Sequence, residues 1–330
     1  MLFYTRLGGR LEFMVRIWLP PVLAVVLAAA VFSAEPVYEL SGRVTPEGRA
    51  TVALHGATRP FATATLSDES GRFTLKKLTA GTYTVAVFIP GRGEARQTVE
   101  VGPGAADSRG RVFLTLRIKE EDFTAEPARR RHSVSTRELA IPEKALRAYQ
   151  DAQKALETRD VEAAVKRLEQ AVALAPQFAM AWNNLGTIAY QTRHFPRAEE
   201  CFREALRQDP SSFEPLVNLG GVLVTLHKLD EALEHNVHAT LTRPNDALAN
   251  AQLGMTYFEL GQFDSAVKYL ERARQIDPTH FSHPQLFLAE IHLRRGQKRE
   301  AALVMEDFLK HHPDYPQAET MRRSILELRQ

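Results

Sequence analysis

The second half of the chain places apolar residues at a helical spacing. In two consecutive segments, residues 182–189 and 198–205, apolar side chains recur at intervals of three and four residues, which puts them on one face of a helix. Residues 191–194 separate the two segments. Pro210 follows the second one, and a proline cannot continue a helix because it lacks the N–H and clashes with the preceding turn. The pattern predicts two helices joined by a short turn and closed by a proline.

The same pattern returns at a fixed interval. Successive prolines are 34, 34, 34 and 35 residues apart: Pro176, Pro210, Pro244, Pro278 and Pro313. Two columns of small residues keep step with them, the first being Ala152, Gly186, Gly220, Gly254 and Ala289. The second column is Ala164, Ala198, Ala232, Ala266 and Ala301. Small residues at these positions let the two helices of a hairpin approach closely. A fixed period of this size predicts that such hairpins stack and form an extended concave surface.

The period, the small-residue columns and the closing proline resemble the tetratricopeptide repeat. The resemblance covers five units within residues 143–314, although Asp151 and Asn236 stand where large apolar residues are usual. It implies that the first helix of each unit lines a concave groove in which a partner binds. Residues 315–330 keep one apolar face, which predicts a capping helix that shields the last unit.

By the same resemblance, the second, fifth, sixth, ninth and twelfth positions of each unit face the groove. The sixth position carries a side-chain amide in four successive units: Gln150, Asn184, Asn218 and Gln252. An amide offers both donors and an acceptor, so a row of amides can pair with the backbone of an extended peptide. Asn is common at this position in the repeat family, and the alternative that these amides only cap or solvate their helices stays open.

Apolar residues at groove positions are a second candidate feature. Tyr190, Val224 and Phe258 occupy the twelfth position, and Met255 occupies the ninth. If they are exposed, they form an apolar stripe of the kind that marks an interaction site, and the alternative is partial burial against neighbouring units. Because Lys and Arg are scarce at groove positions, we expect an uncharged, partly apolar peptide or protein segment as the partner.

Residues 36–118 follow a different pattern, with short alternating or β-branched runs between turn signals. Residues 83–88 and 112–116 are such runs, and the pattern predicts an antiparallel β-sandwich of about seven strands. The stretch from Ser67 to Val85 resembles the carboxypeptidase regulatory-like domain, a transthyretin-like sandwich. The resemblance implies that this domain carries no catalytic residues, because the zinc of such peptidases lies in a separate domain.

Two interpretations of the sandwich aromatics stay open. Phe73, Tyr83 and Phe88 either fill the core, as their alternating strand positions favour, or form a face that binds carbohydrate or cell-wall material while the repeats recruit a protein. His55 is the one histidine of residues 36–118. Since a zinc site needs three protein ligands, we expect no metal there.

Residues 1–34 have the composition of a targeting segment. Residues 17–34 carry no charge and follow three arginines, as in a secretory signal, and Met14 is a second candidate start. We therefore expect an exported protein, periplasmic or extracellular. The alternative is an uncleaved anchor, which would be the chain's attachment to a membrane. Residues 119–142 turn from acidic to basic and predict a solvated linker.

Composition narrows the function classes further. With 42 Lys+Arg against 40 Asp+Glu, the net charge is +2, and we expect no nucleic-acid partner. The single cysteine, Cys201, excludes an intramolecular disulfide, and its acidic neighbours argue against a reactive thiol. His235 and His238 share a helix face, but no third ligand is evident, so we expect no metal and no cofactor.

The sequence carries no phosphate-binding loop, nucleophile elbow or zinc-protease helix motif. We therefore expect a multidomain protein, an antiparallel β-sandwich followed by an all-α tetratricopeptide-repeat solenoid. Its expected function is that of an exported, non-catalytic scaffold whose groove binds a protein or peptide. Carbohydrate or cell-wall binding by the sandwich is the alternative.

Overall fold

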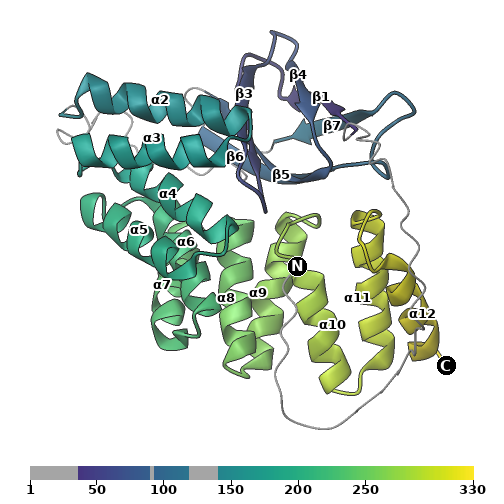
Figure 1. The fold of residues 1–330 in the computed structure, drawn as a ribbon. Coiled ribbons are helices and arrows are strands. Elements are labelled where there is room, and N and C mark those ends of the chain that lie inside the picture. The colour runs from purple at the N-terminus through teal and green to yellow at the C-terminus, as the bar shows by residue number, and fades with distance from the viewer. Residues whose placement is uncertain (1–35, 90–92, 119–139) are drawn as a thin grey trace, which may run out of the picture. The chain divides into compact units, whose positions relative to one another are not determined.

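The structure is a computed structural model that describes residues 36–89, 93–118 and 140–330. Strands come first along the chain and helices follow (Figure 1). The segments interpreted above as a targeting signal and as most of the linker lie outside the described residues. The strands are β1 (Tyr38–Thr45), β2 (Thr51–Gly56), β3 (Ala62–Leu66), β4 (Arg72–Leu78), β5 (Gly81–Ile89), β6 (Gly93–Val101) and β7 (Arg111–Arg117).

The strands form two sheets, and the predicted β-sandwich is confirmed. One sheet has the order β4-β1-β7 and the other β3-β2-β5-β6. The pairing differs from the prediction in one respect, because β1 and β7 run parallel while the other neighbours are antiparallel. The chain between these two strands passes through the second sheet, so β7 returns to β1 by a crossover rather than by a hairpin.

Alternate strand residues point into the sandwich and build its core. Leu40, Val52 and Val85 are fully buried there, as the period of two along a strand requires. Phe73 and Tyr83 belong to the same cluster, and the Tyr83 hydroxyl donates to the Thr79 carbonyl oxygen over 2.8 Å. These two rings therefore stabilise the core and do not form a sugar-binding face.

Eleven helices follow in the described part of the chain, ten of them in five consecutive antiparallel pairs (Figure 1). Helix α12 (Ala318–Leu328) packs against the last pair and buries Ala318 and Ile325. Within the described ranges, no helix combines the length and apolar character needed to cross a membrane. The pairs are α2 (Glu143–Glu157) with α3 (Val161–Leu174), α4 (Ala179–Gln191) with α5 (Phe195–Gln208), α6 (Phe213–Thr225) with α7 (Leu229–Thr242), α8 (Ala247–Glu259) with α9 (Phe263–Ile276), and α10 (Pro284–Arg294) with α11 (Lys298–His311).

Small residues allow the two helices of each pair to touch. A methyl group added at Gly186 on α4 would lie 2.6 Å from the Phe202 ring on α5. At Gly254 on α8 the same methyl group would lie 2.7 Å from Leu270 Cγ on α9. Both distances are too short for two carbon atoms, so at Gly186 and Gly254 a larger residue would force the facing side chain to shift.

Each hairpin turns at one residue with left-handed backbone geometry. The residue has φ between 57° and 72° in all five pairs, where a side chain's Cβ is crowded and glycine is favoured. Only the last two pairs use glycine. In chain order the turn residues are Arg159, Arg193, His227, Gly261 and Gly296.

Ala232 on α7 tests the close helix packing. Replacing it with Leu should lower the free energy of unfolding by about 1–3 kcal/mol, because the alanine is completely buried between α6 and α7 and the added atoms have no space. Ala173 on α3 is the matched control, since its side chain is exposed, and Ala173→Leu should change stability by less than about 0.5 kcal/mol. Urea unfolding of both variants measures the difference. Equal stability of the two variants would contradict the packing.

Candidate functional site

The first helix of each pair carries the candidate amides. Asn184 on α4 donates from Nδ2 to the Tyr149 hydroxyl of the preceding repeat over 3.0 Å. Asn218 on α6 makes the equivalent contact one repeat later, donating to Asn183 Oδ1 over 3.2 Å. Both amides are half-buried, and their Oδ1 atoms accept no hydrogen bond from any residue that the structure describes. Each amide thus ties neighbouring repeats together and keeps an acceptor available.

The two glutamines of the row differ from the asparagines. Gln252 on α8 lies across Gly221 of the preceding repeat, where a methyl group would come within 2.3 Å of its Nε2 atom. Gln150 on α2, in the first repeat, is exposed. The structure therefore brings Asn184, Asn218 and Gln252 into contact with the repeat before them and leaves Gln150 at the solvent.

The apolar candidates are more deeply placed. Val224 is 5% exposed and belongs to the core between α6 and α7, so little of its surface is accessible. Tyr190 packs its ring against Phe195, with 5.5 Å between centroids. Phe258 contacts Phe287 of the next repeat at 5.2 Å, and Met255 packs in the same cluster. These four side chains mainly join helices and repeats.

The most exposed apolar side chain of α4 was not among the candidates predicted from the sequence. Met180 lies at the second position of its repeat and is 54% exposed. Leu293, at the twelfth position of the fifth repeat, is also exposed. Leu146, at the second position of the first repeat, is exposed to the same extent, so the exposed apolar side chains at these positions lie near the starts of α2 and α4 and at the end of α10.

The β-sandwich contacts the array through its edge strand β6. The Thr98 backbone N–H donates to Asp277 Oδ2 over 2.8 Å, and the Thr279 hydroxyl lies 2.8 Å from the Thr98 carbonyl oxygen. Asp277 and Thr279 belong to the loop between α9 and α10, and the Asp277 side chain is buried. Two side chains of the array thus satisfy the backbone groups that an edge strand otherwise leaves unpaired.

Charged side chains reinforce this contact. Arg96 on β6 forms an ion pair with Glu214 on α6 at 3.0 Å, and Arg243 pairs with the same carboxylate at 3.1 Å. Burial alone would raise the pKa of Glu214, but Arg96 and Arg243 outweigh it and lower the pKa below its ordinary value. The carboxylate therefore stays ionised between two guanidinium groups.

The first two repeats contact the sandwich near β2 and β3, at the opposite edge of the four-stranded sheet from β6. The Arg159 guanidinium lies 4.7 Å from the centre of the Phe61 ring, a cation–π contact. Gln191, at the end of α4, donates from Nε2 to the Gly56 carbonyl oxygen over 2.8 Å. These contacts lie at the C-terminal ends of first helices, whereas Glu214 and Asp277 lie at or before N-terminal ends. The contacts therefore lie at the ends of helices and in the loops between them.

The face of the four-stranded sheet that points away from the sandwich core is consequently turned towards the array. His55 on β2 lies on this face, paired in register with Thr84 of β5. Part of the His55 side chain is exposed to solvent. The protein atoms packed around the rest of it, together with nearby Arg96, lower its pKa. The sequence indicated two separate domains and a linker, but gave no signal for this face-to-face contact.

The histidine pair and the cysteine considered in the sequence lie on second helices, α7 and α5. His235 and His238 on α7 acquire no third metal-ligating side chain among the residues that the structure describes. Cys201 on α5 is completely buried, and burial raises the pKa of its thiol to about 11. A thiol with this pKa is protonated at neutral pH and is a poor nucleophile or ligand.

A cluster at the β6 edge was missed by the sequence analysis. Glu100 on β6, His283 at the start of α10 and His312 at the end of α11 lie side by side. Burial, together with the neighbouring His312 and His280, lowers the pKa of His283 to about 3. No short motif links these residues, because Glu100 and His283 lie in different domains.

Two kinds of family model match the chain. Residues 149–213, 188–236 and 216–281 match one model described as tetratricopeptide repeat, and residues 257–325 match another with the same description. Residues 39–115 match the carboxypeptidase regulatory-like domain. Both resemblances stated from the sequence are confirmed.

Curated relatives match only over part of the array. The Homo sapiens "Cell division cycle protein 16 homolog" is 29% identical over 125 residues, which are 35% of this chain and 20% of that protein. The Dictyostelium discoideum "Protein STIP1 homolog" is 29% identical over 104 residues, covering 32% of this chain and 18% of that protein. The chain thus spans about a fifth of the length of these relatives.

Solved structures are similar to part of this chain at low identity. PilW, described as a widely conserved type IV pilus biogenesis factor, has a TM-score of 0.49 at 22% identity, and the match covers 57% of this chain and 91% of PilW. MamA 41-end from Desulfovibrio magneticus RS-1 has a TM-score of 0.48 at 20% identity, with 54% of this chain and 99% of MamA covered.

The Asp277 carboxylate should protect the backbone of edge strand β6 at Thr98. Asp277→Ala leaves the Thr98 N–H without its acceptor, which should lower stability by about 1–3 kcal/mol and speed hydrogen exchange at the Thr98 amide. Exchange measured by NMR or mass spectrometry across β6 tests this. The control is Asp264→Ala, because Asp264 pairs with Arg295 while its side chain is 98% exposed. Unchanged protection of Thr98 in Asp277→Ala would show that the edge does not depend on this carboxylate.

Cys201 should resist alkylation in the folded protein. At pH 8 its thiol is buried and protonated, so iodoacetamide should modify the native chain far more slowly than the chain unfolded in urea. Intact-mass spectrometry over time follows the modification. Equal rates in the two states would contradict the burial of the thiol.

Proposed function

Because the chain belongs to the tetratricopeptide repeat family and carries a carboxypeptidase regulatory-like domain, we propose that it is a non-catalytic scaffold that holds an extended segment of a protein partner along the first helices of its repeats. Tetratricopeptide repeats suggest protein–protein interaction in general. The finer statement, that a segment lies along α4 and α6, rests on the side chains of those helices.

One observation supports this placement above the others. Asn184 and Asn218 stand 34 residues apart on consecutive first helices, and each uses one N–H to fix its own orientation against the preceding repeat. The oxygen of each amide accepts no hydrogen bond from the described residues. Two oriented acceptors in register with the repeat suit the N–H groups of an extended backbone.

The charge of the groove indicates the chemistry of the partner. At the groove positions of the five repeats there is no Lys or Arg, and the acidic residues are Glu214 and Glu290. Glu214 is already paired with Arg96 and Arg243, so it adds little net field. An uncharged segment with apolar side chains for the neighbourhood of Met180 is therefore the ligand class that we propose.

We further propose that the protein acts outside the cytoplasm. The uncharged run of residues 17–34 behind three arginines supports export, and the alternative of an uncleaved anchor is distinguished by the length of the mature chain. Mass spectrometry of the protein purified from its own cells, together with fractionation, tests this part separately from partner binding.

Site-specific photo-crosslinking in the native cell should locate the partner surface. A photoreactive amino acid at Met180 on α4 should capture a discrete partner, because this side chain is exposed at the groove. The matched control is the same substitution at Leu241 on α7, a second helix, where the side chain is 74% exposed. Capture from Leu241 but not from Met180 would move the interaction to the outer helices and overturn the groove proposal.

The amide row is tested by the double variant Asn184→Ala/Asn218→Ala. It should weaken the captured complex by roughly 10-fold or more, since each lost hydrogen bond contributes about 0.5–1.5 kcal/mol. Gln170→Ala is the control, because Gln170 is an exposed amide on α3, outside the groove. Equal affinities of the two variants would contradict a role for the amides, and turnover of the partner would contradict the non-catalytic assignment.

A further inference from the structure

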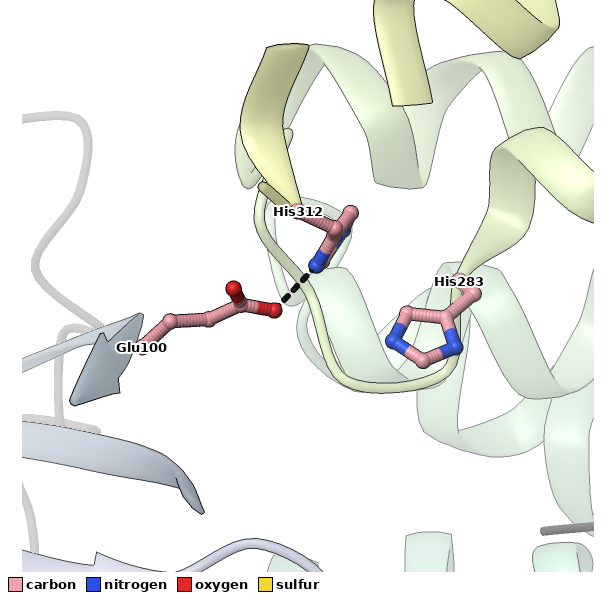
Figure 2. A group of neighbouring side chains, drawn as sticks. All are labelled: Glu100, His283 and His312. Atoms are coloured by element: carbon pink, nitrogen blue, oxygen red, sulfur yellow. Dashed lines mark hydrogen bonds and ion pairs between the residues drawn. The ribbon is translucent and has the colours of Figure 1, made fainter. Parts of the chain in front are cut away.

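Three metal-ligating side chains converge where the sandwich meets the last repeat. Figure 2 shows Glu100 reaching from the end of β6 towards His312, with the His283 ring beside them. One ligand atom from each residue, a carboxylate oxygen and two ring nitrogens, lies within 4.8 Å of the others. Among the residues that the structure describes, this is the one group of three histidine, cysteine or acidic side chains brought together in this way.

The hydrogen bonding of His312 is incomplete. Its side chain is 1% exposed, and its Nδ1 atom bonds to the Glu100 carboxylate. Its Nε2 atom is buried and has no partner among the described residues, although buried polar atoms almost always have one. The ring is fixed by stacking on Phe308, with 4.4 Å between centroids. The ring thus turns Nδ1 towards Glu100 and leaves its buried Nε2 unsatisfied.

The backbone of His283 is also unusual. Its φ is 51°, in the left-handed region that a non-glycine residue rarely adopts. This conformation places its ring perpendicular to that of His312, with 4.7 Å between centroids and an interplanar angle of 78°. Residues held in sparsely populated backbone regions cluster at ligand sites, where the surrounding structure fixes them.

We propose that Glu100, His283 and His312 bind a Zn²⁺ ion that joins the β-sandwich to the last repeat. Two imidazoles and one carboxylate are a ligand set that zinc takes in proteins, with a fourth position left for water. The carboxylate comes from β6 and both imidazoles come from the array, so the ion binds only when the two are in contact. This departs from the sequence analysis, which predicted no metal.

The proposed ion would strengthen the contact between the sandwich and the last repeat. Without it, the end of β6 is held by the Glu100–His312 hydrogen bond, by the backbone of Thr98 bonded to Asp277 and Thr279, and by the nearby Gly104 N–H, which donates to Asp314. With it, three ligands from three separate elements are fixed at one point, and unfolding of either domain must release the metal. Zinc would therefore stabilise the docked arrangement, and chelation would loosen β6 without unfolding the helices.

Zinc titration of the metal-free, full-length protein tests the proposal. Calorimetry should show one saturable Zn²⁺ per chain, and Co²⁺ in its place should give the visible absorption of a tetrahedral site. The variant His283→Asn should lose this binding, and Asn tolerates the left-handed backbone, so the fold is expected to persist. Glu100→Gln, on the sandwich side, should weaken binding by more than about 10-fold, since even outer-sphere partners of zinc contribute that much.

The matched control is His235→Asn on α7, where His235 and His238 share a helix face away from the cluster. This variant should bind Zn²⁺ as the wild type does. Absence of saturable binding to the wild type would mean that the three residues form a hydrogen-bonded contact only, and would overturn the proposal. Unchanged binding in both His283→Asn and Glu100→Gln, or loss in His235→Asn alone, would overturn it equally.

Discussion

The distance between the two helices of each hairpin is the constraint on which the array depends. Gly186 and Gly254 have no side chain because Phe202 and Leu270 occupy the space in front of them. A helix pair of similar length returns in each of the five repeats. The 34-residue period of the sequence therefore becomes a period in space, and groove positions in successive repeats line up.

One hairpin meets this constraint with a polar residue. Asn236 stands where the other hairpins carry a large apolar side chain, and it is completely buried, facing Gly220. Its Nδ2 atom donates to the Thr256 hydroxyl of the next repeat over 2.9 Å, while its Oδ1 atom has no partner among the described residues. An amide with one unsatisfied atom in the core stabilises the fold less than a leucine would. The boundary between these two repeats therefore has a directional hydrogen bond in place of apolar packing.

The sequence predicted the repeats well because their signals are local and recur. A proline, two small residues and a large one within 34 positions are enough to predict a hairpin, and five copies remove most ambiguity. The sandwich was predictable as a class from its turns, but not the parallel pairing of β1 with β7, which depends on a crossover between sheets. For Val224 the sequence could not distinguish a groove residue from a core residue, because this helix position also borders the preceding repeat, whose Ala198 and Phe202 lie in the same cluster.

The contact between sandwich and array was not predictable for a different reason. Repeat arrays are nearly one-dimensional, and each repeat normally touches only its neighbours. The sandwich contacts one residue or more from every repeat, namely Arg159, Gln191, Glu214, Asp277 and His312. None of these residue types is unusual on a surface, and only the fold aligns them.

This long-range contact changes how the groove can work. In an isolated array the repeats can flex relative to one another at small free-energy cost, so a peptide must order them when it binds. Here the sandwich already connects the first repeat to the last, through Arg159 at one end and His312 at the other. Under the proposed function, the orientation of Asn184 and Asn218 is set before a ligand arrives, and the ordering free energy is borne by folding rather than by binding. The proposed scaffold would then gain affinity from pre-organisation, even though its groove offers few charges.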